Sequence, residues 1–167
     1  MSRHGAPATT VLDGAGVRLA IVATRWYAEI TDALLAGALA AAEDCGIGEP
    51  TVARVPGAFE LPVVAQALAA SHDAVVALGL VLRGDTPHFE YVCSAASNGL
   101  GQVALNTGVP IGFGLLTCDN EQQAWDRAGL VDSREDKGRE ATLAAIETAL
   151  LLRDLGVRQG TEFDAQR

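Results

Sequence analysis

The feature that most constrains the fold of this chain is a regular alternation of short apolar runs with longer amphipathic segments between Val17 and Leu155. The apolar runs are rich in Val, Ile, Leu and Ala and have the length of buried strands: 17–24, 51–55, 74–82 and 111–117. The amphipathic segments carry apolar residues at helical spacing: 28–45, 59–71, 87–106, 120–128 and 134–155. The sequence therefore predicts strands and helices in alternation.

This alternation favours a parallel sheet, because parallel strands are joined by crossover helices that cover both faces of the sheet. Right-handed crossovers leave few arrangements of such units. We expect an α/β, flavodoxin-like three-layer α/β/α sandwich around a four-stranded parallel sheet. Residues 17–155 make up one domain. We expect a flexible N-terminal arm over 1–16 before it and a polar C-terminal tail over 156–167 after it.

The composition of the chain excludes several classes of function. The formal net charge is −9 and Lys and Arg form no cluster, so neither nucleic acid nor an anionic membrane is an expected partner. No apolar segment reaches the roughly 18 residues of a membrane span, and the N-terminus lacks the apolar core of a secretory signal. The three cysteines lack metal-ligand spacing and favour reduced thiols. We therefore expect a cytoplasmic protein without a metal site.

The turn after the third apolar run, Arg83-Gly84-Asp85-Thr86-Pro87-His88, joins a buried strand to a helix start. We expect Thr86 to be the N-cap residue and Pro87 the first helical residue. Free backbone N–H groups at a helix start, next to a glycine, favour an anion such as a phosphate group. His88 follows with a side chain that titrates near neutral pH. The turn therefore predicts proton transfer beside a bound anion.

Ligands of open α/β sheets bind beyond the carboxyl ends of the strands, and this rule draws attention to further side chains. Trp26 directly follows the first strand, where its ring either joins the core or stacks on a ligand. Glu60 begins the second helix, where a carboxylate either compensates the helix dipole or accepts hydrogen bonds from hydroxyl groups. Arg127 and Lys137 lie near the boundary of the last two helices, where solvated charges are the ordinary interpretation. His72 is interpreted as a turn residue.

Several known motifs are missing from the sequence. No Gly-x-Gly-x-x-Gly follows the first strand, and the pairs Gly99-x-Gly101 and Gly112-x-Gly114 lack the context of a dinucleotide site. There is no phosphate-binding loop of the Walker type. No Ser/Thr/Gly-rich loop follows the first strand, which argues against a flavodoxin-like electron carrier.

With these residues in view, the chain resembles the lumazine synthase family, also called the riboflavin synthase beta-chain family. The resemblance covers about Val17 to Leu155 and depends on four motifs in the expected order. They are Pro-Gly-Ala-Phe-Glu-Leu-Pro at 56–62, Arg-Gly-Asp-Thr-Pro-His-Phe-Glu-Tyr-Val at 83–92, Asp-Arg-Ala-Gly at 126–129 and Asp-Lys-Gly at 136–138. Each motif alone is moderate evidence, and four in order are strong evidence.

The resemblance implies a transferase that condenses 5-amino-6-(D-ribitylamino)uracil with 3,4-dihydroxy-2-butanone 4-phosphate and needs no cofactor. The product is 6,7-dimethyl-8-ribityllumazine, formed in the penultimate step of riboflavin biosynthesis. His88 is the implied proton-transfer residue. The residues implied to bind the ribitylaminouracil are Trp26, Ala58, Phe59, Glu60, Leu80, Val81, Leu82 and Phe113. Those implied to bind the butanone phosphate are Gly84, Asp85, Thr86, Arg127 and Lys137.

The resemblance also implies individual roles. Trp26 stacks on the pyrimidine, and Leu80 to Leu82 present backbone groups to its edge. Arg127 grips the phosphate as a planar bidentate donor, while Lys137 is only a nearby cation. Phe113 and Arg127 come from a neighbouring subunit, so the implied active site lies at a subunit interface.

The chain departs from the family pattern at three places. Trp26-Tyr27 stands where Phe-Asn is common, and Asp85 brings a carboxylate into the phosphate loop, so backbone N–H contact is the role expected there. The link between Arg127 and Lys137 is longer than in icosahedral members and adjoins the surface where pentamers meet. We therefore expect a free homopentamer, with riboflavin synthase as a candidate protein partner. One alternative is a non-catalytic relative that binds lumazine or flavin; it would be expected to lose His88 or Arg127, and both are present.

Overall fold

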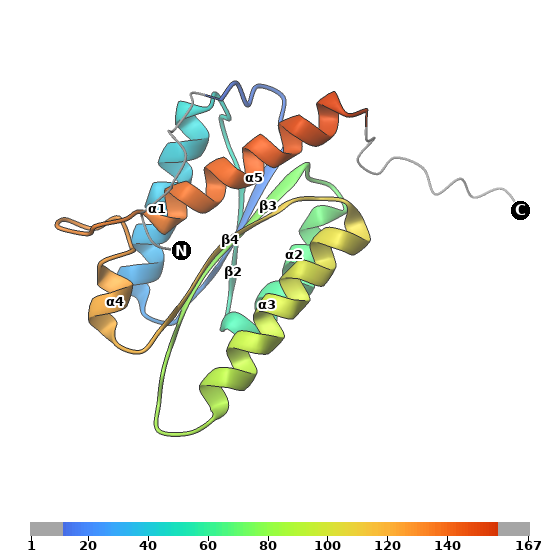
Figure 1. Cartoon of the computed structure of the whole chain (residues 1–167). Coiled ribbons are helices and arrows are strands. Elements are labelled where there is room, and N and C mark those ends of the chain that lie inside the picture. Colours follow the sequence, from blue (N-terminus) through green and yellow to red (C-terminus); the bar gives the residue numbers. More distant parts are fainter. Residues whose placement is uncertain (1–11, 157–167) are drawn as a thin grey trace, which may run out of the picture.

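The four predicted strands form one parallel sheet in the order β2-β1-β3-β4 (Figure 1). The computed structural model describes residues 12–156. Its strands are β1 (Leu19–Thr24), β2 (Thr51–Val55), β3 (Ala74–Leu82) and β4 (Ile111–Cys118). From β1 the chain continues to β2, which lies on one side of β1. From β3 it continues to β4, which lies on the opposite side of the sheet order. The strand order therefore reverses between β1 and β3, and a reversal of this kind opens a ligand crevice at the carboxyl ends of the strands.

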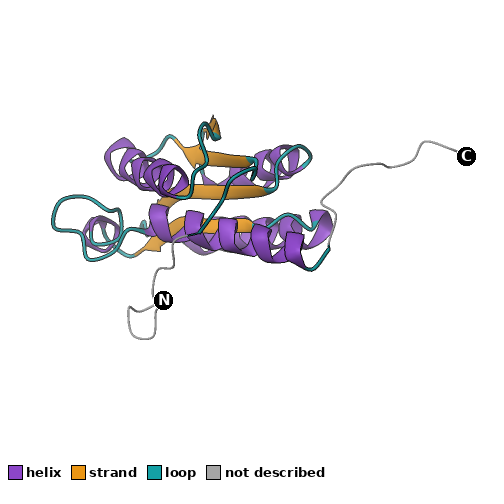
Figure 2. Ribbon diagram, turned by 90° about the horizontal axis from the view of Figure 1, so that it is seen from above, coloured by secondary structure: helices purple, strands orange, loops and turns teal. Residues whose placement is uncertain are grey.

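Helices cover both faces of the sheet and make three layers (Figure 2). One face carries α1 (Ala28–Asp44), α5 (Lys137–Asp154) and the short α4 (Glu121–Trp125). The other face carries the 3-10 turn η1 (Ala58–Glu60), α2 (Leu61–Ala69) and α3 (His88–Thr107). The predicted α/β class and its three-layer, four-stranded parallel architecture are therefore confirmed.

The central strands are apolar throughout because both of their faces are buried. Ile21 and Leu78 face α1 and α5, whereas Val22 and Ala77 face α2 and α3. All four side chains are fully buried. The residues of the two cores thus alternate along β1 and β3, as the pleat of a strand requires.

Three glycines let α5 approach its neighbours closely. A Cβ atom added at Gly138 would lie 2.0 Å from the carbonyl oxygen of Leu34 in α1. A Cβ at Gly112 in β4 would lie 2.4 Å from the carbonyl oxygen of Ala141, and one at Gly114 would lie 3.3 Å from the Cβ of Ala141. The Gly112-x-Gly114 pair, which the sequence excluded as a dinucleotide motif, therefore has a packing role.

Several helix starts differ from the prediction. The helix α3 begins at His88, Pro87 is its N-cap residue, and no side chain caps it; the prediction of Thr86 as the cap was wrong. Pro87 has φ −62 but ψ 0, so the helical conformation starts one residue later. The last helix begins at Lys137 rather than Arg134, because the Asp136 carboxylate caps it by accepting from the Arg139 N–H at 2.9 Å.

The first described residues, which belong to the predicted N-terminal arm, pack against the domain. Leu12 packs against the α1–α5 core, and the Gly14 N–H donates to the Cys45 carbonyl oxygen at 2.8 Å. Residues 1–11 of the predicted arm and 157–167 of the predicted tail lie outside the described residues. Among the helices within 12–156, none is long and apolar enough to cross a membrane.

Candidate active site

The carboxyl ends of the strands bring most of the predicted site residues to one edge of the sheet. Figure 1 shows that α4 and the start of α3 lie at this edge, each following a strand that ends there. The turn after β1 carries Trp26, the turn after β2 carries η1, and the turn after β3 carries residues 83–88. Parallel strands place these turns side by side, as the sequence predicted.

The first two turns meet at Gly57. The Arg25 N–H donates to the Val55 carbonyl oxygen at 3.0 Å, which ties the turn after β1 to the end of β2. A Cβ atom at Gly57 would lie 3.9 Å from the Trp26 ring and 3.3 Å from the Glu60 carboxylate, so both side chains flank the glycine. The Trp26 side chain is 65% exposed. Its ring is therefore available for stacking rather than buried in the core.

Glu60 has a local hydrogen bond as well as a place at the site. Its Oε2 accepts from the Gly57 N–H at 2.9 Å and thereby fixes the entry to η1. A carboxylate has two oxygens, so one remains for hydroxyl groups of a ligand. Phe59, between the two residues, is 66% exposed, and Ala58 is buried beneath them. The turn therefore offers an exposed aromatic ring and an acceptor side by side.

The end of β3 offers backbone groups to a ligand. The pairing of β1 with β3 ends at Ala23 and Leu78, whereas the pairing of β3 with β4 continues to Leu82 and Cys118. Beyond Leu78, within the described chain, β3 therefore has a ladder partner only on its β4 side. The other side of the Leu80–Leu82 backbone has no strand of the described chain beside it. Backbone amides there can read the edge of a flat, polar ring.

The turn after β3 is open to solvent. Gly84, Asp85, Thr86 and His88 are all exposed, and a Cβ atom at Gly84 would have no neighbour within 4 Å. The first N–H groups of α3 have no intrahelical acceptor, because helices leave their first donors unpaired. These donors and the glycine suit an anion, and the His88 imidazole lies at the same helix start.

Tyr27, to which the sequence gave no role, starts α1 in the left-handed conformation with φ 54 and ψ 60. This conformation is uncommon for a tyrosine and suits Asn much better. An Asn at this position would fit the backbone with less strain than the tyrosine. The Tyr27 ring lies 6.4 Å from the Trp26 ring, centroid to centroid.

Three predicted site residues remain, Phe113, Arg127 and Lys137, and in the described chain they are not bonded to these turns. Phe113 lies in β4 opposite Ala77, on the α2–α3 side and away from the strand end, and it is 49% exposed. Arg127 follows α4 and donates to the Gln123 carbonyl oxygen at 2.7 Å. In the described residues, neither it nor Lys137 makes a hydrogen bond or ion pair with the turns after β1, β2 or β3.

Lys137 is held by two carboxylates. Its Nζ lies 2.9 Å from Glu135 and 2.5 Å from Glu140. Burial alone would lower the pKa of Lys137, but the hydrogen bonds to Glu140 and Glu135 raise it. Glu135 also lies 4.0 Å from the Arg127 guanidinium. Arg127 is therefore a half-buried, positioned cation rather than a freely solvated charge.

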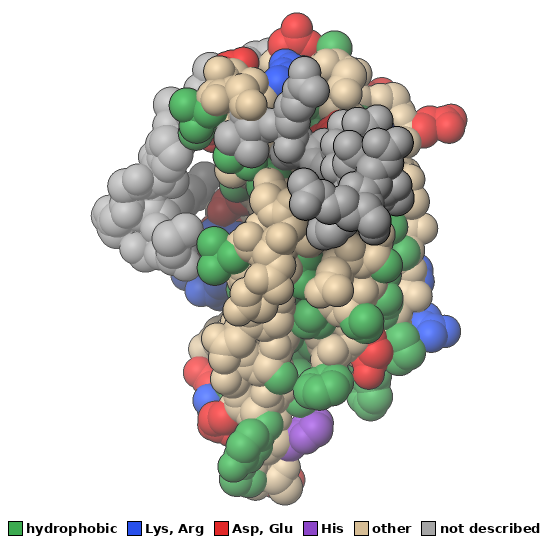
Figure 3. Space-filling view, turned by 90° about the vertical axis from the view of Figure 1, so that its right-hand side faces the viewer, with side chains coloured by type: hydrophobic (Ala, Val, Ile, Leu, Met, Phe, Trp, Pro, Cys, Tyr) green, Lys and Arg blue, Asp and Glu red, His purple; other side chains and the backbone are tan. Residues whose placement is uncertain are grey.

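Exposed apolar side chains gather on the α2–α3 face, which Figure 3 shows from the side. The large ones in and beside these helices and β4 are Phe59, Val63, Tyr91, Leu105 and Phe113. Several exposed large apolar residues on one face are typical of a protein interface. Phe113 belongs to this group, so a second subunit on this face would bring it near another chain's site.

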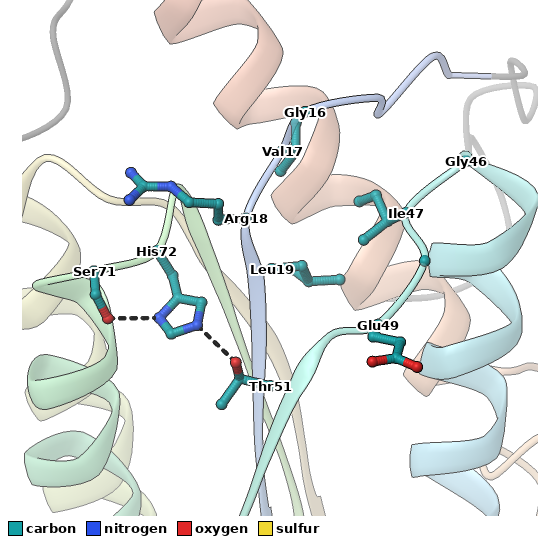
Figure 4. A pocket seen from close by; sticks show the side chains of 11 residues that line it. Gly16, Val17, Arg18, Leu19, Gly46, Ile47, Glu49, Thr51, Ser71 and His72 are labelled. Carbon is teal, nitrogen blue, oxygen red and sulfur yellow. Dashed lines mark hydrogen bonds between the residues drawn. The ribbon is translucent and has the colours of Figure 1, made fainter.

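A polar hollow of about 300 Å³ lies at the opposite, amino end of the sheet (Figure 4). His72 lines it, with Nδ1 2.8 Å from the Leu68 carbonyl oxygen and Nε2 2.9 Å from the Thr51 hydroxyl. The imidazole thus links the end of α2 to the start of β2, in agreement with its interpretation as a turn residue. None of the predicted site residues lines this hollow.

The fold and the site define a class of protein: an open parallel α/β protein that presents aromatic rings, a carboxylate, backbone amides and an exposed glycine-containing turn at one sheet edge. Residues 16–153 match the model of the 6,7-dimethyl-8-ribityllumazine synthase family. The chain belongs to this family, as the motifs of the sequence predicted.

Relatives with this name match along nearly their whole length. The one from Frankia casuarinae is 66% identical over 156 residues, which cover 93% of this chain and 98% of the relative. The one from Renibacterium salmoninarum is 60% identical over 159 residues, 92% and 100% of the two chains. The one from Saccharopolyspora erythraea is 58% identical over 164 residues, 98% and 99%.

Proposed function

We propose that the protein condenses 5-amino-6-(D-ribitylamino)uracil with 3,4-dihydroxy-2-butanone 4-phosphate to give 6,7-dimethyl-8-ribityllumazine. It is a transferase that acts on small molecules in riboflavin biosynthesis. The observation that carries this conclusion is family membership over 16–153, together with the gathering of Trp26, Glu60, Leu80–Leu82 and the turn 84–88 at one sheet edge.

The geometry supports a separate place for each substrate. We propose that the pyrimidine stacks on Trp26 with its polar edge against the free side of the Leu80–Leu82 backbone. The ribityl chain then lies along Ala58 and Phe59, with its hydroxyls donating to Glu60. The phosphate of the ketone binds the backbone N–H groups of Gly84, Asp85 and Thr86 and the start of α3.

Chemistry then proceeds between two held reactants. The amine of the pyrimidine attacks the ketone carbonyl and forms an imine with loss of water. Phosphate leaves, and the second amine closes the ring with loss of another water. His88 supplies and removes protons at these steps, a role that typically contributes about 10²–10⁴-fold. Orientation of the two substrates supplies a further large part of the acceleration.

We further propose that the active protein is a homopentamer. Within the described residues Arg127 makes no hydrogen bond or ion pair with the turns of the site, Phe113 lies away from the end of β4, and the α2–α3 face carries exposed apolar side chains. A neighbouring copy on that face supplies the missing groups, with Arg127 on the phosphate and Lys137 as a cation near it. Light scattering tests this: we expect five times the 17.3 kDa chain mass, whereas a monomer or a sixty-subunit shell contradicts it.

The test of the reaction is to mix both substrates with the protein and to record the absorbance and fluorescence of the lumazine. Product is expected only with both substrates present. A protein that binds lumazine but forms none would instead be the non-catalytic binder. A cytoplasmic location and a complex with riboflavin synthase are proposed alongside; Cys45, Cys93 and Cys118 are free thiols, as a reducing compartment requires.

A further inference from the structure

Arg83, at the start of the phosphate-binding turn, touches both ends of that turn and the neighbouring strand. Its backbone N–H donates to the Cys118 carbonyl oxygen at 2.9 Å. Its guanidinium donates through Nε to the Asp119 carboxylate at 2.7 Å and through Nη1 to the Glu90 carboxylate. The same guanidinium lies over the Phe89 ring, 4.2 Å from the centroid. One side chain therefore joins the end of β3, the end of β4 and the first turn of α3.

These contacts close a loop around the proposed phosphate site. The chain leaves β3 at Arg83, runs through the exposed turn 84–86, and returns to Arg83 at Phe89 and Glu90. Nothing else in the described chain holds this turn by a side-chain hydrogen bond: the side chains of Asp85, Thr86 and His88 make none. Within the described chain, the side-chain hydrogen bonds at the two ends of this turn are therefore those of Arg83.

The charge of Arg83 is already balanced by its partners. Hydrogen bonding from Arg83 lowers the pKa of Asp119 and of Glu90, so both carboxylates are ionised at neutral pH. The guanidinium of Arg83 uses its Nε and Nη1 for the two carboxylates, and one of its faces lies against the Phe89 ring. With both carboxylates ionised, Arg83, Asp119 and Glu90 together carry a net negative charge, so this group of side chains does not attract a phosphate by its charge.

We propose that Arg83 is a positioning residue for the phosphorylated ketone: it clamps the turn 84–86 in the conformation that binds phosphate, without contacting the phosphate. This inference depends on the proposed function, because it deepens the role given to that turn. A preformed turn binds an anion more tightly than a loose one, since less ordering is needed on binding.

The first test compares Arg83→Gln with the wild type in steady-state kinetics. We expect the KM for the butanone phosphate to rise about tenfold, while the KM for the pyrimidine changes by less than about twofold. Inorganic phosphate, used as a competing probe, should lose affinity by a similar factor. Arg83→Lys keeps the positive charge and one ion pair but not the planar fork, so it should restore only part of the loss.

The matched control is Arg18→Gln. Arg18 is also exposed and also grips a carboxylate through two nitrogens, with Asp73 at 2.7 and 3.1 Å. It lies at the amino end of β1, remote from the turn, so both KM values should stay unchanged. If the wild type forms no lumazine, the proposed function fails. If the wild type is active and Arg83→Gln leaves both KM values unchanged or raises both equally, only the clamp fails.

Asp119→Asn separates the clamp from direct binding, because the two predict opposite signs. If Arg83 holds the turn in place, loss of the Asp119 charge weakens the contacts of Arg83, and the KM for the ketone rises. If Arg83 bound the phosphate itself, removal of a competing carboxylate would free the guanidinium and lower that KM. A KM for the ketone that falls, or that does not change, therefore overturns the proposal.

Discussion

Thr24 closes β1 at the edge of the proposed site, and its side chain is fully buried. Among the described residues, its hydroxyl oxygen has no hydrogen-bond partner. It packs against Gly79, where an added Cβ would lie 2.8 Å from that oxygen. A buried hydroxyl without a partner lowers stability, because it has lost its bonds to water.

We expect Thr24→Val to raise the free energy of unfolding by about 1 kcal/mol, since a methyl group of the same shape replaces the unpartnered hydroxyl. Chemical denaturation measures the change. The matched control is Thr142→Val in α5, where the equally buried hydroxyl donates to the Gly138 carbonyl oxygen at 2.8 Å. That variant should lose stability or stay the same, and an equal loss in both variants would contradict the argument.

The raised pKa of the Asp136 carboxyl leads us to expect that stability depends on pH. Desolvation by burial raises its pKa above the ordinary value of 3.8, so the folded chain binds this proton more tightly than the unfolded chain. Its contribution to stability therefore falls as pH rises through that range, and the cost is fully present above the raised pKa. Asn is an equally good helix cap, so Asp136→Asn should gain stability relative to wild type as pH increases.

The measurement is a series of denaturation curves from about pH 4 to neutral, and Asp73→Asn is the control of opposite sign. Burial opposes the ionisation of Asp73, but hydrogen bonds from the Arg18 side chain and N–H lower its pKa. Its contribution to stability is present above the ordinary pKa and is lost as pH falls. Asp73→Asn should therefore lose stability at neutral pH. If the stability of Asp136→Asn relative to the wild type does not increase with pH, the raised pKa of Asp136 is contradicted.

At the scale of elements, α1 and α5 cross where a glycine on α5 meets the backbone of α1. A Cβ atom at Gly138 would lie 2.0 Å from the Leu34 carbonyl oxygen, and backbone cannot yield as a flexible side chain can. We expect Gly138→Ala to lower the free energy of unfolding by about 2 kcal/mol or more, as overpacking does. Thermal or chemical unfolding gives the value.

The control is a glycine in a helix with free space around it. Gly101 in α3 has no atom within 4 Å of an added Cβ, so Gly101→Ala should be neutral or raise stability by up to about 1 kcal/mol. If both variants have the same effect, helix propensity rather than the α1–α5 crossing decides the outcome.

The sequence predicted the elements well where local pattern decides them. The bounds 51–55 and 74–82 agree with β2 and β3, because an apolar run flanked by polar turns specifies a buried strand. Helix starts were less predictable, because several residues compete for each cap. Asp136, rather than a residue near Arg134, caps α5 since only its side chain reaches the Arg139 N–H.

For the site, the sequence predicted which turns share an edge but not how their groups are used. The free backbone edge of Leu80–Leu82 follows from the shorter reach of β1 beside β3, a matter of register that no local pattern encodes. The contact of Arg83 with Asp119 joins residues 36 positions apart, and its contact with Glu90 spans the whole turn. The only sequence signal for them was a charged residue directly after a buried strand.

At the scale of the whole molecule, the proposed function implies that one chain carries two half-sites. One half contains the turn 84–88 with His88, and the other carries Arg127 and Phe113. Under the proposed function, each active site joins the first half of one subunit to the second half of the next, as head-to-tail contacts in a ring allow. The His88 and the Arg127 of any one active site should then come from two different subunits.

Mixed assemblies test this directly. His88→Ala should reduce kcat by about 10²–10⁴-fold, and Arg127→Ala should raise the KM for the butanone phosphate far more than that for the pyrimidine. The two variants are unfolded together in equal amounts, refolded, and assayed at a low ketone concentration at which each variant alone is nearly inactive. About a quarter of all interfaces then pair an intact His88 with an intact Arg127. Activity should therefore return to about a quarter of the wild-type rate.

The control for this experiment is a mixture of the two variants that were assembled separately. Without exchange of subunits no interface has both intact halves, so that mixture should show only the mean of the two parents. Recovery after joint refolding, and none before it, places Arg127 across the interface from His88. If joint refolding also gives only the mean, both groups act within one chain, and the apolar α2–α3 face serves assembly without completing the site.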